Sequence, residues 1–504
     1  MLDVREMTIA HAQDGFKTKK FTAHELTSAF LDRIATLDKN GPRINSTMAL
    51  STTVLDEAAA LDAYLEEKSQ LKGKLHGIPV LVKDQADTKG MITTYGSTVA
   101  KENVPDEDAT VVTKLKEAGA LILGKTTMAE WASVWVSANG ATDYEFTKNP
   151  YNHIYDVGAS SGGSAAALSA NFSILAVGED TGGSIRVPSS FCNLVGLRPT
   201  PGLISRTGFC PLLKHQDTPG PMARTVMDCA LMLDCIVGFD PKDEYTGFAA
   251  TATALGLPRG GSYASSLQNG PKKMKVARIG VVREQFGSDS DPYCKAVNKV
   301  MREAMDKLQG AGTTFVDVHI DNLQHYLHYP LVYVQRSRSD INSFLMTKPH
   351  LPQDIADFVP EVADRDYLTT LCQTMHGPRD PKDDPTFVDR ILQRDDFKRK
   401  IDCVVASLDL DALMLPDVRV PPPLIADATN GRFMDNGSFS FPVNTFLASV
   451  ALLPAISVPA GFTDDGLPVG MELVGLEYQE QHLLELARGV ENILGARRAP
   501  PAPL

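Results

Sequence analysis

The sequence predicts an α/β fold, because short apolar runs typical of buried strands alternate with segments of helical periodicity. Residues 78–82 form one such run, residues 109–118 carry apolar side chains at helical spacing, and residues 120–123 form a second run. The composition agrees, since 43% of the 504 residues are hydrophobic and 22% are charged, as in ordinary globular proteins.

A helical segment over about residues 1–70 precedes the first predicted strand. Thr22 and Glu25 match a capping box, and Leu26, Phe30 and Ile34 follow at helical spacing. A second helix is predicted over about residues 55–68. The strand over 78–82 then ends at Lys83.

The chain is rich in glycine, serine and alanine from residue 158 to 208, with a small-residue helix predicted at 164–170 and a strand at 174–177. Residues 240–400 are less patterned, and we expect helices and loops there that shape a substrate site. Further strands are predicted at 412–416 and 455–459, and a closing helix at 481–492. We expect one domain over residues 1–504.

Charge and cysteine content exclude some partners and compartments. The net charge of -13 disfavours nucleic acid and anionic membranes, which select basic surfaces. Residues 437–462 carry no charge, but Pro442, Pro454 and Pro459 favour loop and strand over a membrane span. Seven cysteines without a C-x-x-C pair, and an N-terminus unlike a signal peptide, predict a cytoplasmic protein.

Two short motifs match known patterns but lack the structural context that those patterns need. GALILGKT at residues 119–126 fits the P-loop pattern, yet its four central residues are the predicted strand and not a phosphate-binding loop. GASSG at 158–162 fits the nucleophile elbow of α/β-hydrolases, yet a polar, turn-like segment precedes it instead of a strand.

The histidines of this sequence do not indicate a catalytic triad or a metal site. None of His215, His319 and His376 lies in a context that suits a catalytic triad. His325 and His328 have the spacing of metal ligands on one helix, but no third ligand is evident, so we expect no metal and no cofactor.

Three local features together predict acyl-transfer chemistry. They are Lys83 at the end of a buried strand, Ser160 and Ser161 in a glycine-bounded turn, and residues 180–184 after another strand. Each alone has a plain structural explanation, as a solvated lysine or a flexible loop. Amide hydrolysis needs a nucleophile, a base and donors for the oxyanion, and the three features offer a serine, a lysine and a run of unhindered backbone N–H groups. Burial would push the lysine pKa from about 10.4 to roughly 7 or 8, at a cost of about 4 kcal/mol.

The motifs that carry these features resemble the amidase signature family over most of the chain. The matching segments are GIPVLVKD (77–84), GASSGGSAAA (158–167), GEDTGGSIR (178–186), GLRPT (196–200), DTPGPMARTV (217–226) and GLPVG (466–470). The resemblance implies a large mixed β-sheet flanked by helices on both faces.

The resemblance also implies a Ser–cis-Ser–Lys triad. Ser184 would be the nucleophile, Ser160 the relay after a cis peptide bond, and Lys83 the base, acting through an acyl-enzyme or carbamoyl-enzyme. It further suggests an oxyanion hole and a set of residues that hold the catalytic loops. The oxyanion hole would comprise Thr181, Gly182, Gly183 and Ser184, and the supporting residues would be Ser161, Asp180 and Arg186.

The expected function is hydrolysis of small amides, aryl amides or carbamates by a stand-alone or urethanase-like amidase. Val187 stands where amidotransferase subunits of this family typically carry glutamine, but an ammonia-transferring subunit is the alternative, and a silent binding protein is a third reading. The sequence is compatible with a homodimer but does not determine the oligomeric state. We expect pocket walls from Trp131, Trp135, the segment after Tyr326 and residues 439–445.

Overall fold

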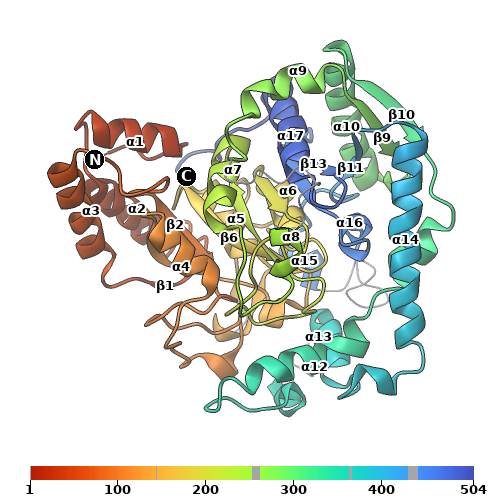
Figure 1. Ribbon diagram of the computed structural model, residues 1–504, viewed down its shortest axis with the longest axis horizontal. Coiled ribbons are helices and arrows are strands. Elements are labelled where there is room, and N and C mark those ends of the chain that lie inside the picture. Colours follow the sequence, from red (N-terminus) through yellow and green to blue (C-terminus); the bar gives the residue numbers. More distant parts are fainter. Residues whose placement is uncertain (1, 143–144, 252–261, 362–365, 430–440) are drawn as a thin grey trace.

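The computed structural model describes residues 2–142, 145–251, 262–361, 366–429 and 441–504. Its core is an eleven-stranded sheet of order β1-β3-β2-β6-β8-β7-β12-β13-β11-β9-β10 (Figure 1). The strands are β1 (Thr47–Leu50), β2 (Pro79–Lys83), β3 (Leu121–Thr126), β6 (Leu175–Asp180), β7 (Val195–Arg198), β8 (Thr218–Ala223), β9 (Arg278–Val282), β10 (Thr314–Val318), β11 (Ala412–Pro416), β12 (Ala455–Phe462) and β13 (Pro468–Val474).

The sheet is mixed and covered on both faces. Strand β2 runs parallel to β3 and β6, whereas β6 and β8 are antiparallel. All residues of β2, β3, β6, β7 and β8 are buried. Since side chains alternate between the two faces of a strand, this burial means that both faces are packed, which confirms the predicted α/β architecture.

Most predicted helices form close to their expected positions. Helix α2 (Ala23–Leu37) begins with the capping box of Thr22 and Glu25, and α3 (Val54–Lys68), α4 (Thr110–Glu117) and α17 (Glu480–Leu494) match the other periodic segments. Helix α5 (Gly162–Ser169) is fully buried, and α6 (Arg186–Phe191) follows β6 after a short turn. Both termini lie on the same side of the molecule, where Arg497 pairs with Glu6 at 2.7 Å (Figure 1).

The region from 240 to 400 contains more regular structure than the sequence pattern predicts. It contributes β9 and β10 to the sheet. Its helices include α10 (Pro292–Gly310), α12 (Tyr333–Leu345), α13 (Thr369–Met375) and α14 (Phe387–Ser407), the last of which lies across the molecule from α1 (Ile9–Lys17) and α3 (Figure 1). The N-terminal 70 residues likewise contain β1 besides their helices.

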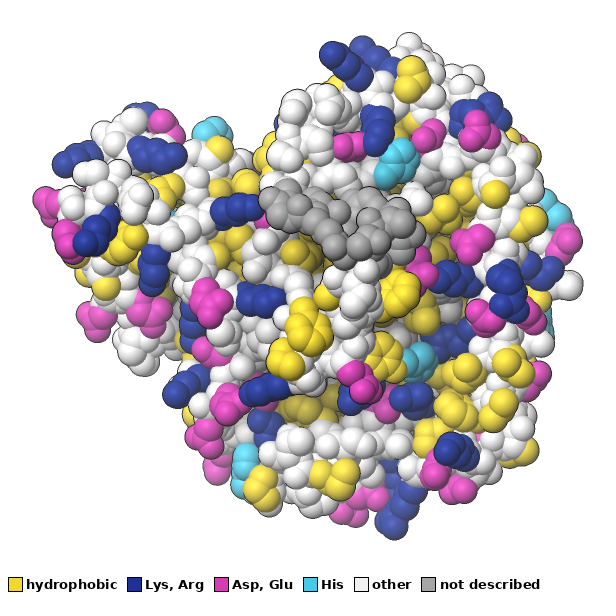
Figure 2. All heavy atoms as spheres, viewed as in Figure 1, with side chains coloured by type: hydrophobic (Ala, Val, Ile, Leu, Met, Phe, Trp, Pro, Cys, Tyr) yellow, Lys and Arg dark blue, Asp and Glu magenta, His cyan; other side chains and the backbone are white. Residues whose placement is uncertain are grey.

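The described residues contain no helix long and apolar enough to cross a membrane. The segment from 446 onward forms α16 (Phe446–Val450) and β12, while residues 437–440 lie outside the described part. On the face shown in Figure 2, acidic and basic side chains are interspersed over the surface.

Candidate active site

The centre of the candidate site is Lys83, the last residue of β2. Its side chain is fully buried, and its Nζ lies 2.7 Å from Ser160 Oγ. Nζ also lies 3.2 Å from both the backbone oxygen and the Oε2 atom of Glu179. Burial lowers the pKa of Lys83, and the Glu179 carboxylate opposes that shift.

Ser160 lies in the turn before α5, and the peptide bond between Ala159 and Ser160 is cis. The backbone oxygen of Ser160 accepts from the N–H of Ala129 at 3.2 Å, and the N–H of the next residue, Ser161, donates to Ser184 O at 3.1 Å. Ser161 Oγ donates to Glu179 O at 3.1 Å. These bonds hold the turn against the end of β6.

Ser184 lies in the turn between β6 and α6, is 6% exposed and lines a pocket of about 20 Å³. The pocket wall combines apolar and hydroxyl-bearing side chains, and besides Ser184 it is formed by Ala132, Ser133, Val134, Trp135, Thr181, Gly182, Leu212, Tyr333, Thr370 and Phe446. A serine hydroxyl in such a pocket is accessible to a substrate carbonyl while most of its surroundings exclude water.

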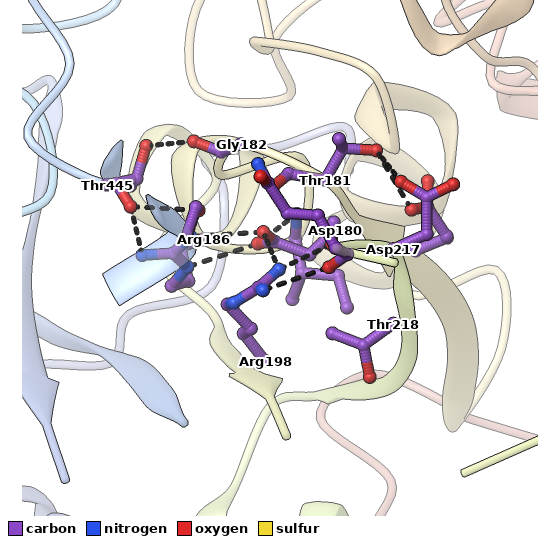
Figure 3. Close-up of polar contacts among 12 residues, drawn as sticks. Asp180, Thr181, Gly182, Arg186, Arg198, Asp217, Thr218 and Thr445 are labelled. Atoms are coloured by element: carbon purple, nitrogen blue, oxygen red, sulfur yellow. Dashed lines mark hydrogen bonds and ion pairs between the residues drawn. The ribbon is translucent and has the colours of Figure 1, made fainter. Parts of the chain in front are cut away.

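Asp180 anchors the base of this turn. Arg186 donates to its carboxylate from Nε at 3.1 Å and Nη2 at 3.0 Å, and Arg198 Nη1 donates to it at 3.0 Å. Burial would raise the pKa of Asp180, but the two guanidinium groups hold it well below its ordinary value. Figure 3 shows both arginines converging on Asp180.

The loop that follows is fixed from the other side by distant parts of the chain. Thr445 Oγ1 donates to Gly182 O at 2.6 Å, and Arg186 Nη1 donates to Thr445 O at 3.0 Å (Figure 3). Gln216 Nε2 donates to Thr181 O at 2.7 Å. These contacts hold the run from Thr181 to Ser184 in one conformation.

The structure therefore gathers the residues singled out in the sequence. Lys83, Ser160 and Ser161 meet the turn from Asp180 to Ser184, and Arg186 reaches back to Asp180. Their chemical roles stay predictions. Trp135 lines the pocket of Ser184, as expected, whereas Trp131 packs between Tyr95 and Phe358. Within the loop expected near 439–445, residues 439 and 440 lie outside the described part.

Sequence reasoning missed several residues of the site. Glu179, Arg198 and Asp217 lie inside the matching motifs without a predicted role, Tyr333 and Thr445 lie in segments expected only as pocket walls, and Glu472 comes from a distant segment. Glu472 Oε1 accepts from Arg186 Nη1 at 2.5 Å. The position of Glu179 at the end of an apolar strand was the available signal, because a buried carboxylate needs a partner.

The two motifs that lacked their structural context have other roles in the fold. The run from 121 to 126 is strand β3, and Lys125 is buried and contacts Ala86 O at 2.5 Å, so this segment has no phosphate-binding loop. No strand directly precedes the turn at Ser160. Within the described ranges, no cluster of three or more His, Cys, Asp or Glu side chains suits a metal ion.

The chain is similar to known proteins in both sequence and fold. The Amidase family model matches residues 25–484. One relative is a glutamyl-tRNA(Gln) amidotransferase subunit from Pseudomonas savastanoi pv. phaseolicola. It is 35% identical over 507 aligned residues, covering 97% of this chain and 98% of the relative.

Two solved structures extend the comparison to the fold. The peptide amidase from Stenotrophomonas maltophilia is 31% identical, with a TM-score of 0.85 and 99% of both chains covered. The corresponding glutamyl-tRNA(Gln) amidotransferase subunit from Thermotoga maritima is 26% identical, with a TM-score of 0.76, and the match covers 100% of this chain and 99% of that one.

Proposed function

We propose, since this chain belongs to the amidase family, that it hydrolyses the C–N bond of small amides, aryl amides or carbamates. Ser184 is the nucleophile, Ser160 the proton relay and Lys83 the base. The observation that carries the proposal is the 2.7 Å contact between Lys83 Nζ and Ser160 Oγ inside a fully buried site.

The proposed reaction begins with a neutral Lys83 amine. The amine takes the proton of Ser160, Ser160 takes that of Ser184, and Ser184 Oγ bonds to the substrate carbonyl carbon. The backbone N–H groups of Thr181, Gly182, Gly183 and Ser184 stabilise the oxyanion. The proton returns through Ser160 to the departing amine as the C–N bond breaks, and water then hydrolyses the acyl-enzyme, or the alkoxycarbonyl-enzyme that a carbamate leaves, and frees Ser184.

Burial supports the role of Lys83 as base. A lysine in water is charged near pH 7 and cannot accept a proton, but removal from water favours the neutral amine. Lys83 has no exposed surface, and its pKa is lowered accordingly. A general base contributes about 10²–10⁴ to a rate when its pKa lies near the working pH.

The pocket supports an apolar acyl or carbamoyl group. Trp135, Tyr333 and Phe446 supply aromatic walls, and Val134 and Leu212 add aliphatic surface. Tyr333 begins α12, so the region from 240 to 400 contributes directly to the wall. The pocket has a volume of about 20 Å³ and no charged side chain in its wall, so it suits a small uncharged acyl group better than a charged one.

A second candidate function is that of an amidotransferase subunit, favoured by the 35% identity to the Pseudomonas relative. Val187 and the greater structural similarity to the peptide amidase support the hydrolase instead. Such a subunit would need glutamine and partner chains, whereas a hydrolase needs neither.

The deciding experiment is amine release by the purified single chain from a panel of amides, anilides and carbamates, with L-glutamine as a separate arm. Turnover of the panel without added partner chains supports the hydrolase. Activity that appears only with glutamine and added partner chains supports the amidotransferase function and contradicts the proposal.

A further inference from the structure

Glu179 supplies two of the three acceptors around the Lys83 amine. Its backbone oxygen and its Oε2 atom each lie 3.2 Å from Nζ, and Ser160 Oγ is the third atom at 2.7 Å. A neutral amine has two N–H bonds and one lone pair. If both N–H bonds point at Glu179, the lone pair points at the Ser160 hydroxyl, which is the direction that a base requires.

The other carboxyl oxygen of Glu179 meets the hydroxyl of Thr181. Thr181 Oγ1 lies 3.1 Å from Glu179 Oε1 and 2.5 Å from Asp217 Oδ1. A hydroxyl has one hydrogen and can donate it to only one of these two oxygens. The second contact is a hydrogen bond only if one of the two carboxyl groups carries a proton.

The contacts of Asp217 indicate which carboxyl group that is. Leu212 N and Leu213 N donate to Asp217 Oδ2 at 2.8 and 2.9 Å, and such donors favour an ionised carboxylate. Glu179 Oε1 faces the hydroxyl of Thr181. A chain of donors from Glu179 through Thr181 to Asp217 therefore satisfies all three groups when Glu179 is protonated.

We propose that Glu179 positions the Lys83 amine and holds the proton that Lys83 must lose to act as a base, an inference that rests on the proposed function of Lys83. The Lys83 ammonium loses a proton to the Glu179 oxygen that faces it, and rotation of the protonated carboxyl group turns that O–H toward Thr181, so one N–H bond breaks and one O–H bond forms. The net charge of the pair is zero before and after the transfer. Base activation then needs no proton exchange with bulk water.

Burial raises the pKa of Glu179, Lys83 lowers it and Asp180 raises it again. Burial and the neighbouring Glu179 also raise the pKa of Asp217, so the assignment of the proton to Glu179 rests on the two backbone N–H groups that donate to Asp217. The acidic, basic and other titratable side chains that interact with Glu179 are Lys83 on β2, Asp180 on β6, Arg198 on β7, Asp217 before β8, Cys210 in the loop before it, and Tyr333 on α12. Of the two flanking cations, Lys83 is the one in contact with the carboxyl group.

Glu179 also borders a cavity of about 200 Å³, separate from the pocket of Ser184. Asp217 and Gln85 line it as well, and Gln85 Oε1 is buried without a hydrogen-bond partner. Proton exchange between Glu179 and solvent, which the transfer from Lys83 does not itself require, can thus occur from this cavity and not through the substrate pocket.

Two substitutions separate orientation from charge. Glu179→Gln keeps an acceptor for Lys83 and a donor for Thr181, as a protonated glutamate does, whereas Glu179→Ala removes both. We expect Glu179→Ala to lower kcat by about 10²-fold through misplacement of the amine. Glu179→Gln should recover most of that loss, with the acid limb of the kcat/KM profile at the wild-type pH. Glu480→Gln, at a buried glutamate that accepts from Thr200 N, is the matched control for the profile.

Two results in these profiles would overturn the proposal. A move of the acid limb to lower pH by about one unit or more in Glu179→Gln means that an ionised Glu179 holds the proton on Lys83. Wild-type kcat in Glu179→Ala means that Glu179 does not position the amine.

An infrared measurement tests the protonation without activity. The spectrum of the wild type at neutral pH minus that of Glu179→Gln should contain the C=O stretch of a protonated carboxylic acid. Hydrolysis of amides without this band overturns the Glu179 proposal alone. If the band is present but the protein hydrolyses none of the substrates, the proposed function is contradicted while the protonation of Glu179 is supported. Both readings hold even if Glu179→Ala fails to fold.

Discussion

The hydroxyl of Thr445 donates a hydrogen bond to the carbonyl oxygen of Gly182 at 2.6 Å across 263 positions of sequence. A Cβ atom added to the neighbouring Gly183 would lie 2.1 Å from Thr445 Oγ1, and Gly183 has a φ of 137° that side chains rarely adopt. The loop over Thr181 to Ser184 is thus held by contacts that leave no room for side chains at its glycines.

The closeness of Tyr333 to this loop gives the first prediction. A Cβ atom at Gly182 would lie 2.4 Å from the Tyr333 hydroxyl, so Gly182→Ala must displace either the loop or the tyrosine. We expect kcat/KM to fall by about 10²–10³ through loss of oxyanion contacts. Adding Tyr333→Phe to the Gly182→Ala variant should restore part of the lost kcat/KM. Gly247→Ala is the control and should have wild-type activity, because a Cβ atom at Gly247 would have no neighbour within 4 Å. Wild-type kinetics in Gly182→Ala would count against the loop as oxyanion hole.

Lys83→Met tests the base while keeping the buried volume. We expect kcat to fall by about 10²–10⁴, because methionine cannot accept the proton of Ser160. Circular dichroism and the unfolding midpoint check that the variant is folded. A folded variant with wild-type kcat would exclude Lys83 as the base.

Asp180→Asn should destabilise the protein by about 3–5 kcal/mol, because it leaves Arg186 and Arg198 buried without their shared carboxylate. The pKa of Asp180 is lowered in the folded state, so its contribution is full above the ordinary value of 3.8 and is lost as the pH falls below it. In denaturant unfolding experiments, the difference in free energy of unfolding between the wild type and Asp180→Asn should therefore be constant near neutral pH and decrease in acid. An equal stability near neutral pH would contradict the assigned role.

The raised pKa of Asp156 predicts that its contribution to stability depends on pH with the opposite sign. Asp156 lies just before the turn that carries Ser160 and accepts from Gly158 N at 2.6 Å and Ser137 Oγ at 2.8 Å. Burial raises the pKa of Asp156 from 3.8 to about 6. The folded state therefore binds the proton more tightly, and stability falls by about 3 kcal/mol as the pH rises from about 4 to about 6.

The stability of the wild type minus that of Asp156→Asn isolates this contribution. The difference should decrease over the same pH range in urea unfolding experiments. A difference that stays flat, or that grows with pH, would show that Asp156 is ionised in the folded protein throughout.

Much of the sheet could be predicted because its central strands are apolar. The runs at 78–82 and 120–123 became β2 and β3, and the end of β2 placed Lys83 in the core. Strand β8 could not be predicted this way, since Pro219 and Pro221 are atypical of a central strand. The structure accommodates them because β7 pairs only with Ala223 and Met222, so the prolines have one neighbouring strand.

Edge strands and the polar partners of the site escaped prediction for another reason. Strand β10 is half exposed and β1 pairs only with β3, so neither has the continuous apolar run of a buried strand. The partners of Lys83 and Gly182 depend on tertiary contacts. Glu179 and Thr445 meet them across 96 and 263 positions, a relationship that local periodicity does not contain.

The most direct test of the account is to trap the intermediate. The protein is mixed with a carbamate whose covalent adduct with serine hydrolyses slowly. The reaction is then quenched, the protein is digested, and the modified peptide is located by mass spectrometry. We expect the added mass on Ser184 in the wild type and no added mass in Ser184→Ala. An adduct on Ser160, or turnover of the carbamate by Ser184→Ala at the wild-type rate, would contradict Ser184 as the nucleophile.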